Sequence, residues 1–584
     1  MSTNSAPVRF LQRAVESLVP FQQPDGALFD PVFNVQTQYG TAYFGWCCAV
    51  LADIAGQEWR DRAHAALTQA LDHTSRPELP AHASGFDTAT LGVIGRGNHR
   101  DFTWPPILRT FAALGSEDDL VATIAAVDPE QSFHARPPSN WASVWMSGEW
   151  LRMRAGLSTT TGDQFDDWLD VFFAEVLDID RGLFSERGLP NAYDLFTRTH
   201  LADLLVVGYD GRNAERLREF LTAGLRRSLG LQLSDGSVAS GYRSTGQTWV
   251  LGAQISFFTA ARHLGLGTPS EQQQAGLAAW RAFDSMQRWQ RPDGPYSPVQ
   301  NLHPPELRVG YEGYTADGHY SPLALAFLAT AITRGFGADE QPSGNDLDHR
   351  ESAGWGEAEP TWRAVVHHGR MSAAVQAAAD HVYDGCGLVD LTFGTGRRLH
   401  LATSARHLSG GPWVNPGLAI ADQPSGTAIP LSGEDQTPVA PILVNDGKLE
   451  YQTTFASDSR LQGNRYRLTL NLTDSSVQVE ESLTSGDQQQ PRPGESSSES
   501  RLSRSLLVPF LADDGGQERT RLRWLPNGAE LELAGEKLII EIGAEIDRRT
   551  VIPDGYQNRR GRCGLIRFDL AQPTPTLTWS ILSR

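Results

Sequence analysis

Six segments of this chain concentrate side chains that could recognise a sugar: YGTAYFGW (39–46), RGNHRDFTW (96–104), SNWASVWMSGEW (139–150), NAYDLFTRTH (191–200), SGYRSTGQTW (240–249) and GYEGYTADGHYSP (310–322). Aromatic faces suit the apolar C–H faces of a sugar ring, and hydrogen-bonding groups suit its hydroxyl edges. A single Trp or Tyr is more simply explained as core filling. The same chemistry in six segments indicates a carbohydrate site.

Arginines stand in several of these segments, although the chain carries a net charge of −19. Guanidinium groups offer planar donors to a carboxylate or sulfate on a sugar, and the plainer alternative for each is a structural salt bridge. The predicted substrate contacts are Arg96, His99, Arg100, Trp104, Trp141, Trp145, Arg198, Tyr311 and Tyr314. We therefore expect an anionic glycan, namely a uronate-containing polysaccharide or oligosaccharide.

The six segments must be positioned by helices, because they recur about every 54 residues between amphipathic and apolar helical patterns. Charge-bearing helices are predicted near 7–18, 57–75, 116–127, 163–178, 212–229 and 270–289. Apolar helices are predicted near 41–54, 104–114, 141–155, 195–207, 246–264 and 321–334. Six such pairs can close into an (α/α)6 toroid, and an open superhelix would give a similar pattern. We expect closure over residues 1–336, with the six segments at one end of the ring.

The second half of the chain has the alternation of β-strands. The runs KLEYQTTF, RYRLTLNL, RTRLRWL, AELELAG and KLIIEIG alternate with period two, and Asn445-Asp446-Gly447 and Asn527-Gly528 are typical hairpin turns. At least ten such strands predict a large antiparallel β-sandwich over 361–584. Residues 337–360, rich in Gly, Pro, Asp and Glu, are predicted to be a linker.

Composition excludes several other classes of protein. An acidic chain repels a phosphate backbone, so nucleic acid is not an expected partner. No run of about 18 apolar residues exists, so no membrane-spanning helix is expected. The start lacks the basic and apolar regions of a signal peptide, so we expect a cytoplasmic protein unless the sequence has been trimmed. The four cysteines have neither disulfide nor zinc spacing.

The combination of an (α/α) toroid and a large β-sandwich resembles the polysaccharide lyases of the hyaluronate, chondroitin AC and xanthan lyase type, and the heparinase II/III and alginate lyase relatives. In those families an Asn, a His and a Tyr act together, with an Arg and a Glu nearby. Asn140-Trp141 is similar to their Asn-Trp pair, and Tyr193, His200, Arg243 and Glu312 follow. The order differs, because hyaluronate-type lyases carry the His before the Tyr.

Since Tyr193 precedes His200 here, His200 could instead be a structural residue of its helix. Tyr242 and His319 are then alternative partners. The resemblance thus implies a catalytic set of Asn140, Tyr193, His200, Tyr242, Arg243, Glu312 and His319.

β-Elimination is chemically compatible with this set. A neutral donor such as Asn140, helped by Arg243, could stabilise the anion that forms when a uronate loses its C5 proton. Tyr or His could take that proton, and Tyr could protonate the leaving oxygen. The phenol would need a nearby cation to favour its phenolate. No metal or other cofactor is expected, because Asn and Arg can neutralise the carboxylate.

Two other functions remain open. A uronic-acid-specific glycoside hydrolase on the same toroid would need an acid and a base across the scissile bond. The carboxylates available in or near the six segments are Asp101, Glu149, Asp194, Glu312 and Asp317. A non-enzymatic glycan-binding protein, using the aromatic residues as a passive groove, is the third alternative.

Overall fold

The computed structural model describes residues 5–37, 39–75, 100–115, 118–309, 315–338, 363–378, 383, 385–393, 414–421, 427–445, 447–459, 461–485, 503–515, 518–558, 560–572 and 574–583. The chain forms two compact units. The helical unit comprises Met1–Leu229, Gln247–Gln300 and Tyr311–Ser343, and the β unit comprises Gly230–Gly246, Asn301–Gly310 and Gly344–Arg584. Two segments of the expected toroid therefore belong to the β unit. Most of the predicted linker, from residue 339, lies outside the described residues.

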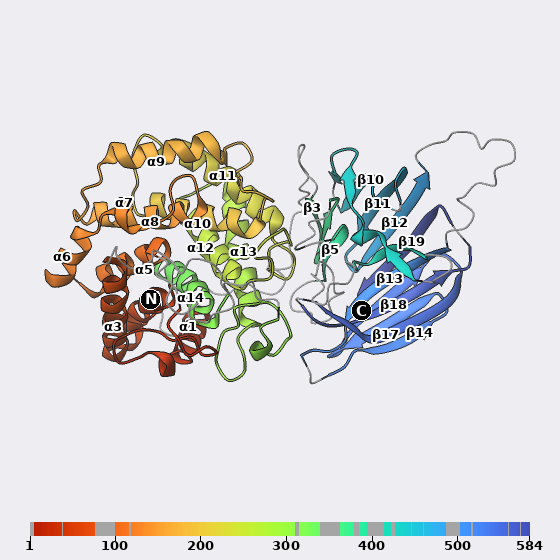
Figure 1. Cartoon of the computed structure of the whole chain (residues 1–584), viewed down its shortest axis with the longest axis horizontal. Helices are drawn as coiled ribbons and strands as arrows, with labels where there is room; N and C mark the ends of the chain where they lie inside the picture. The colour runs from red at the N-terminus through yellow and green to blue at the C-terminus, as the bar shows by residue number, and fades with distance from the viewer. Residues whose placement is uncertain are drawn as a thin grey trace. The chain divides into compact units, whose positions relative to one another are not determined.

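Six apolar helices form the inner ring of the helical unit (Figure 1). They are α2 (Gly40–Ala55), α5 (Arg100–Leu114), α8 (Asn140–Arg154), α10 (Asn191–Val206), α12 (Trp249–His263) and α14 (Asp317–Thr333). Each contacts the next, and α14 contacts α2. The predicted closed ring is thus confirmed, and an open superhelix is wrong. These helices are apolar on nearly every side because neighbours and outer helices cover them together.

Amphipathic helices alternate with the inner ones along the chain. They are α1 (Ala6–Glu16), α3 (Gln57–Ser75), α6 (Asp118–Ala126), α9 (Gly162–Glu175), α11 (Ala214–Leu231) and α13 (Pro269–Gln287). The short elements of this unit are η1 (Val19–Phe21), α7 (Pro129–Ser132), β1 (Leu177–Asp178) and β2 (Leu183–Phe184). Helix α3 shows the pattern: Trp59, Leu67 and Leu71 are buried, and α3 packs along α2. Thr161 and Thr268 begin α9 and α13 with capping boxes, which satisfy the free backbone N–H groups there.

The β unit contains three antiparallel sheets. One has the order β14-β15-β16-β19-β12-β11-β10-β8, with β9 also paired to β10; the others are β17-β18-β13-β6-β7 and β3-β4-β5. The strands are β3 (Arg363–His368), β4 (Met371–Gln376), β5 (Gly387–Phe393), β6 (Gly417–Ala421), β7 (Ala428–Pro430), β8 (Gln436–Pro438), β9 (Leu443–Asn445), β10 (Lys448–Phe455), β11 (Asn464–Leu472), β12 (Ser476–Ser485), β13 (Ser503–Leu511), β14 (Arg521–Leu525), β15 (Gly528–Leu533), β16 (Glu536–Ile542), β17 (Ile546–Asn558), β18 (Gly561–Leu570) and β19 (Thr576–Ser583). The short helices η2 (Pro305–Leu307) and η3 (Leu431–Gly433) also belong to this unit.

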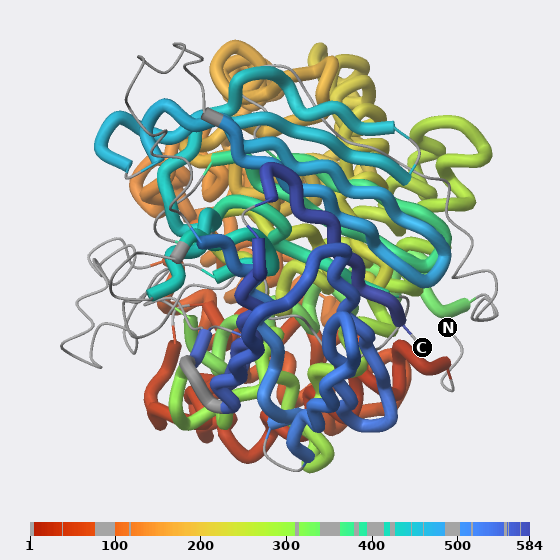
Figure 2. The backbone as a smooth tube through the Cα atoms, turned by 90° about the vertical axis from the view of Figure 1, so that its right-hand side faces the viewer, coloured from red at the N-terminus to blue at the C-terminus, as the bar shows by residue number. Residues whose placement is uncertain are grey.

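The strands of these sheets run through the teal to blue part of the tube in Figure 2. One apolar core joins the three sheets, as expected for a sandwich. Strand β10 shows why: along KLEYQTTF every second side chain is buried, beginning with Leu449, and these side chains join the core. The hairpin predicted at Asn527-Gly528 joins β14 to β15. The predicted strands and the sandwich are confirmed.

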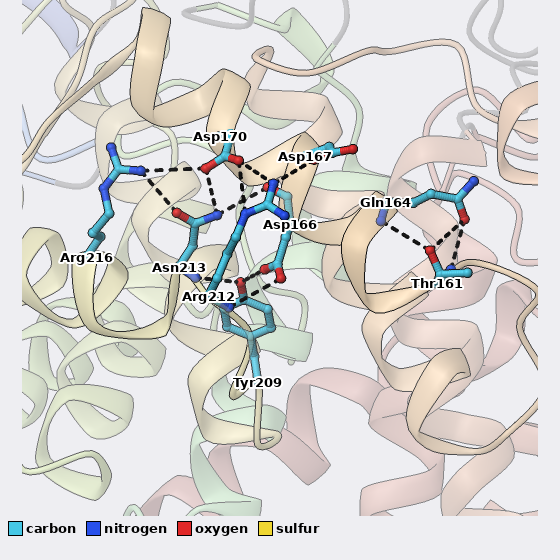
Figure 3. A network of polar contacts seen from close by, with 9 residues as sticks. All are labelled: Thr161, Gln164, Asp166, Asp167, Asp170, Tyr209, Arg212, Asn213 and Arg216. Carbon is cyan, nitrogen blue, oxygen red and sulfur yellow. Dashed lines mark hydrogen bonds and ion pairs between the residues drawn. The ribbon is translucent and has the colours of Figure 1, made fainter.

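A polar network on the outer surface ties α9 to the connection between α10 and α11 (Figure 3). Arg212 pairs with Asp167 at 2.6 Å and also with Asp170, while Asn213 donates to Asp170 at 2.9 Å. The Tyr209 hydroxyl donates to Asp166. These contacts hold α9 against the α10–α11 connection, and none of the residues that make them lies in the six predicted segments. Within the described part of the chain, no helix has the length and apolar character needed to cross a membrane.

Candidate functional site

The beginnings of the inner helices meet in a closed circuit of aromatic rings. All ring distances are between ring centroids. Tyr39 stacks on Phe102 at 5.0 Å, and Phe102 stacks on Phe196 at 5.5 Å. Phe196 contacts Trp249 at 5.3 Å, Trp249 contacts Tyr320 at 6.5 Å, and Tyr320 returns to Tyr39 at 6.4 Å. Because these residues come from the beginnings of α2, α5, α10, α12 and α14, the described helix-entry residues of five predicted segments converge at one rim of the ring.

Two glycines and an aspartate allow α2 and α14 to begin so close together. A Cβ at Gly40 would lie 1.8 Å from the carbonyl oxygen of Gly318, so only glycine fits at that position. The fully buried Asp30 accepts a hydrogen bond from Gly318 N at 2.6 Å. Sequence reasoning missed Asp30, although an Asp shortly before an Asn and a helix is a turn signal.

Three predicted catalytic residues lie at this rim. Asn140 is the first residue of α8, where Ser139 caps the helix, and its amide Nδ2 donates to Glu186 Oε2 at 2.7 Å. Tyr193, the third residue of α10, contacts Trp249 at 5.9 Å. His319, the third residue of α14, contacts Tyr39 at 4.7 Å. The rim therefore combines an amide donor and a phenol, which are 6% and 7% exposed, with a fully buried imidazole, all beside the packed aromatic rings.

His200 lies deeper in the ring. It follows Tyr193 by two helical turns, about 10 Å along α10. Its ring contacts Phe196 at 4.7 Å and Phe327 at 5.7 Å, and its Nδ1 lies 3.4 Å from Ser147 Oγ. Burial lowers the pKa of His200 to about 4, so the imidazole is neutral at physiological pH. This environment is that of an internal structural residue.

A charged cluster lies beyond His200, toward the carboxyl ends of the inner helices. Asp203 pairs with Arg109 at 2.7 Å and with Arg334 at 2.6 Å, so it links α5, α10 and the end of α14. Burial alone would raise the pKa of Asp203, but Arg334 and Arg109 reverse this and lower it. Sequence reasoning missed this cluster. The available signal was a charged residue inside otherwise apolar helices, as at Arg109 and Asp203.

Two of the predicted tryptophans serve packing inside the helical unit. Trp104 donates to Glu149 at 3.3 Å, and Trp145 donates to the Ala135 carbonyl at 2.9 Å. Both rings are almost fully buried. Trp141 is different, because its half-buried ring meets the edge of Phe102 at 5.9 Å and so stands beside the aromatic circuit.

The two described arginines of the predicted substrate contacts in this unit are also buried. Arg198 is fully buried and pairs with Asp194 at 2.8 Å, and it also donates to Ser228 and to the Gly224 carbonyl. Arg100 is 1% exposed and lies 3.4 Å from the His73 carbonyl. Their guanidinium groups therefore connect the helices around them. The sequence could not show this, because a helical residue's direction depends on how the helix is rotated in the ring.

Tyr242 and Arg243 belong to the β unit. Tyr242 has φ = 66° and Ser244 has φ = 64°, both in the left-handed region that non-glycine residues rarely adopt. The ring of Tyr242 contacts Tyr383 at 4.9 Å. Glu312, Tyr311, Tyr314, Arg96 and His99 lie outside the described residues. The sharing of one cavity by all the predicted catalytic residues thus stays a prediction.

Three of the five carboxylates considered for hydrolysis are engaged in structural hydrogen bonds and ion pairs. Asp101 accepts from the backbone N–H groups of Ala135 and His134, and burial raises its pKa. Glu149 is fully buried and accepts from Arg152, Thr160 and Ser158. Asp194 is bound by two arginines and by Phe184 N. In the described residues, no group of three or more His, Cys, Asp or Glu side chains could hold a metal ion.

No protein-family model and no curated protein matches the sequence. The solved structures that share the fold along this chain include two lyases. A mutant chondroitin AC lyase of Streptomyces coelicolor A3 is 14% identical with a TM-score of 0.52, and the alignment covers 100% of this chain and 80% of that one. A Paenibacillus xanthan lyase is 9% identical with a TM-score of 0.52, covering 99% of this chain and 57% of that one. This chain therefore has the fold of polysaccharide lyases, a helical toroid followed by an antiparallel sandwich.

Proposed function

We propose that this chain is a polysaccharide lyase that cleaves a uronate-containing glycan by β-elimination. The observation that carries the proposal is the rim of the helical unit, where Asn140, Tyr193 and His319 lie beside a closed circuit of aromatic rings. An amide donor and a phenol are the groups that elimination needs. The rings of the circuit are 1–6% exposed and pack on one another, so they hold these groups in place, and the half-buried Trp141 is the aromatic face beside them.

Elimination breaks the C5–H and C4–O bonds of the uronate and forms a C4–C5 double bond without adding water. The amide of Asn140 would hydrogen-bond the uronate carboxylate and stabilise the negative charge that develops when the C5 proton leaves. A tyrosine would accept that proton, and a tyrosine would return a proton to the leaving oxygen. Tyr193 and Tyr242 are the two candidates, and Arg243 remains the predicted ligand of the carboxylate.

The burial and structural contacts of the five candidate carboxylates favour elimination over hydrolysis. A hydrolase needs one carboxyl group as acid and another carboxylate as base or nucleophile, both facing the scissile bond. Asp101, Glu149 and Asp194 are 0–1% exposed and hold the helices and loops around them. Of the five candidates only Asp317 is left among the described residues, and it is 5% exposed. Glu312 lies outside the described residues, so within the part of the chain that the structure describes these five candidates offer no second carboxylate beside Asp317.

The solved structures support the same proposal. The S. coelicolor protein bears the name of a chondroitin AC lyase, and the Paenibacillus protein that of a xanthan lyase. The former was solved as a tyrosine-to-alanine mutant. At 14% and 9% identity these proteins support the reaction class and leave the glycan of this chain open.

An ultraviolet-monitored screen tests the proposal. The purified chain would be incubated with chondroitin, hyaluronate, xanthan, heparan and alginate, and parallel samples would be assayed for reducing ends. We expect absorbance near the ultraviolet edge from the new C4–C5 double bond, rising together with reducing ends on at least one substrate. Reducing ends without that absorbance would instead support the hydrolase, and neither signal would support a glycan-binding protein.

A further inference from the structure

The segment that carries Tyr242 and Arg243 is built into the β unit although it connects two toroid helices in sequence. Residues 230–246 begin with the last two residues of α11 and end before α12, yet they belong to the same compact unit as the sandwich. Their apolar side chains pack against the three-stranded sheet β3-β4-β5. The buried cluster consists of Leu231, Leu233, Ala239, Val365, Ala374 and Val389.

Polar contacts fasten this segment at its start and in its middle. His367 Nε2 lies 2.9 Å from the Gly230 carbonyl oxygen, and His367 Nδ1 lies 2.7 Å from Ser372 Oγ. Ser234 Oγ lies 2.6 Å from Thr392 Oγ1. All of these side chains are buried, so water cannot easily replace the contacts.

Asp390 fastens the segment at Ser240, two residues before Tyr242. Its Oδ2 accepts from Ser240 N at 2.6 Å, and its Oδ1 accepts from Ser240 Oγ at 3.0 Å. Oδ1 also accepts from Arg560 Nη2 at 2.5 Å. Asp390 is 3% exposed, so the guanidinium partner and the two Ser240 donors together make its buried charge tolerable.

Beyond this anchor the backbone is strained. Tyr242 and Ser244 hold positive φ values of 66° and 64°. Such conformations cost about 1–3 kcal/mol each and persist only where the surroundings determine them. Thr245 Oγ1 accepts from Gly241 N at 3.0 Å and donates to the Tyr242 carbonyl at 2.9 Å. These two hydrogen bonds of Thr245 stabilise the conformation of the turn, and the hydrogen bonds from Ser240 to Asp390 determine where the turn begins.

Arg560 connects the same anchor to a second segment. Its carbonyl oxygen accepts from Leu302 N at 2.9 Å, and its guanidinium group holds Asp390. Nearby, His303 Nε2 lies 2.8 Å from the Asn558 carbonyl oxygen. Residues 301–309 also belong to the β unit, and the predicted site residues Tyr311, Glu312 and Tyr314, which follow in the sequence, lie outside the described residues. One residue at the β17–β18 turn thus holds both segments.

We infer that Asp390, held by Arg560, is a positioning residue of the reaction: it sets the strained turn that orients the Tyr242 phenol and the Arg243 guanidinium. This inference rests on the proposed function, because it gives Tyr242 and Arg243 roles in elimination. A displacement of about 1 Å in a reacting group can cost roughly 100-fold in rate.

The test is Asp390→Asn in the full chain. The variant keeps the shape of the side chain but removes its negative charge. It also places an NH2 donor where one of the two oxygens accepts from Arg560 or Ser240. We expect kcat to fall about 10- to 100-fold, with KM changed less than about threefold. In the Tyr242→Phe background, Asp390→Asn should add little, because the residue acts through Tyr242.

Asp569→Asn is the matched control. Asp569 accepts from Ser505 Oγ at 2.6 Å and from Arg567 Nε at 2.5 Å, so it repeats the Ser–Asp–Arg arrangement near the far end of β18. We expect near-wild-type kcat from this variant even if its melting temperature drops as much as that of Asp390→Asn. Wild-type kcat in Asp390→Asn, or an equal loss in both variants, would overturn the inference. Wild-type turnover in Tyr242→Phe would count against the role of Tyr242 itself, which is a separate result.

Discussion

The Asn140 amide donates to Glu186 Oε2 at 2.7 Å, and this contact fixes which way the amide faces. A carboxylate accepts hydrogen bonds only, so Nδ2 must point toward Glu186, leaving one N–H and the carbonyl oxygen for other partners. The orientation of the proposed carboxylate ligand therefore depends on a residue that the sequence did not single out.

Substitutions at Glu186 should separate orientation from charge. We expect Glu186→Ala to lower kcat about 10-fold, because Asn140 can then rotate away from its working orientation. Glu186→Gln should retain most of the rate, since the glutamine carbonyl still accepts from Nδ2. Steady-state ultraviolet assays of both variants check this, with thermal melting to show that each is folded. If the alanine variant is as fast as wild type, Glu186 does not position Asn140.

Removal of one hydroxyl should identify the proton carrier. We expect Tyr193→Phe or Tyr242→Phe to lower turnover by about 10²- to 10⁴-fold, because loss of a general acid or base has that cost while the ring still packs. The control is Tyr296→Phe, which removes a buried hydroxyl that lies 3.4 Å from the Thr248 carbonyl oxygen. Near-wild-type rates in both test variants would favour a hydrolase instead.

Arg243 should matter through its planar fork as well as its charge. We expect Arg243→Ala to weaken kcat/KM about 10- to 100-fold, the cost of losing a hydrogen bond to a charged group. Arg243→Lys should be impaired less, because it keeps the charge but loses bidentate geometry. Arg226→Ala, which removes an exposed partner of Glu271, is the control. Normal turnover of a uronate substrate by Arg243→Ala would contradict the anionic-sugar proposal.

His200 should make the helical unit less stable in mild acid. Its pKa is about 4 in the folded chain and about 6.5 when unfolded, so between these values the unfolded chain binds more protons. The stabilisation is complete above about pH 6.5 and is lost as the pH falls toward 4. At pH 5 the loss should be about 2 kcal/mol. Urea unfolding at pH 7 and pH 5 measures it, and His200→Gln should lose correspondingly less on acidification.

Asp203 should be a major contributor to the stability of the ring. We expect Asp203→Asn to lower the free energy of unfolding by about 3–5 kcal/mol, because it leaves Arg109 and Arg334 buried without their countercharge. Asp170→Asn is the control: Asp170 pairs with Arg212 and Arg216 on the exposed outer surface, where such pairs contribute about 1 kcal/mol or less. Equal losses of unfolding free energy in the two variants would show that the buried cluster contributes no more to stability than the exposed pair does.

Periodicity by itself determined much of this protein. The alternation of charged and apolar helices predicted six pairs, and the period-two runs predicted the sandwich, because both patterns record which faces are buried. The convergence of the aromatic segments at one rim also followed from the repeat, since equivalent positions in a ring of helix pairs lie at the same end. Asn140, Tyr193 and His319 lie in these segments, and the resemblance to polysaccharide lyases singled them out.

Tertiary structure decided which side chains face the rim and which unit holds each segment. Inner helices are apolar on nearly every side, so their sequences do not show that Trp145 donates to a backbone carbonyl and Arg198 pairs with Asp194, while Phe196 joins the aromatic circuit. Likewise nothing local assigns residues 230–246 to the β unit, because their anchors, Asp390 and His367, lie far along the chain. Burial patterns are local, so they can be predicted from the order of residues in the sequence. The rotation of a helix about its axis and the long-range anchoring of a segment depend on partners that only the folded chain brings together.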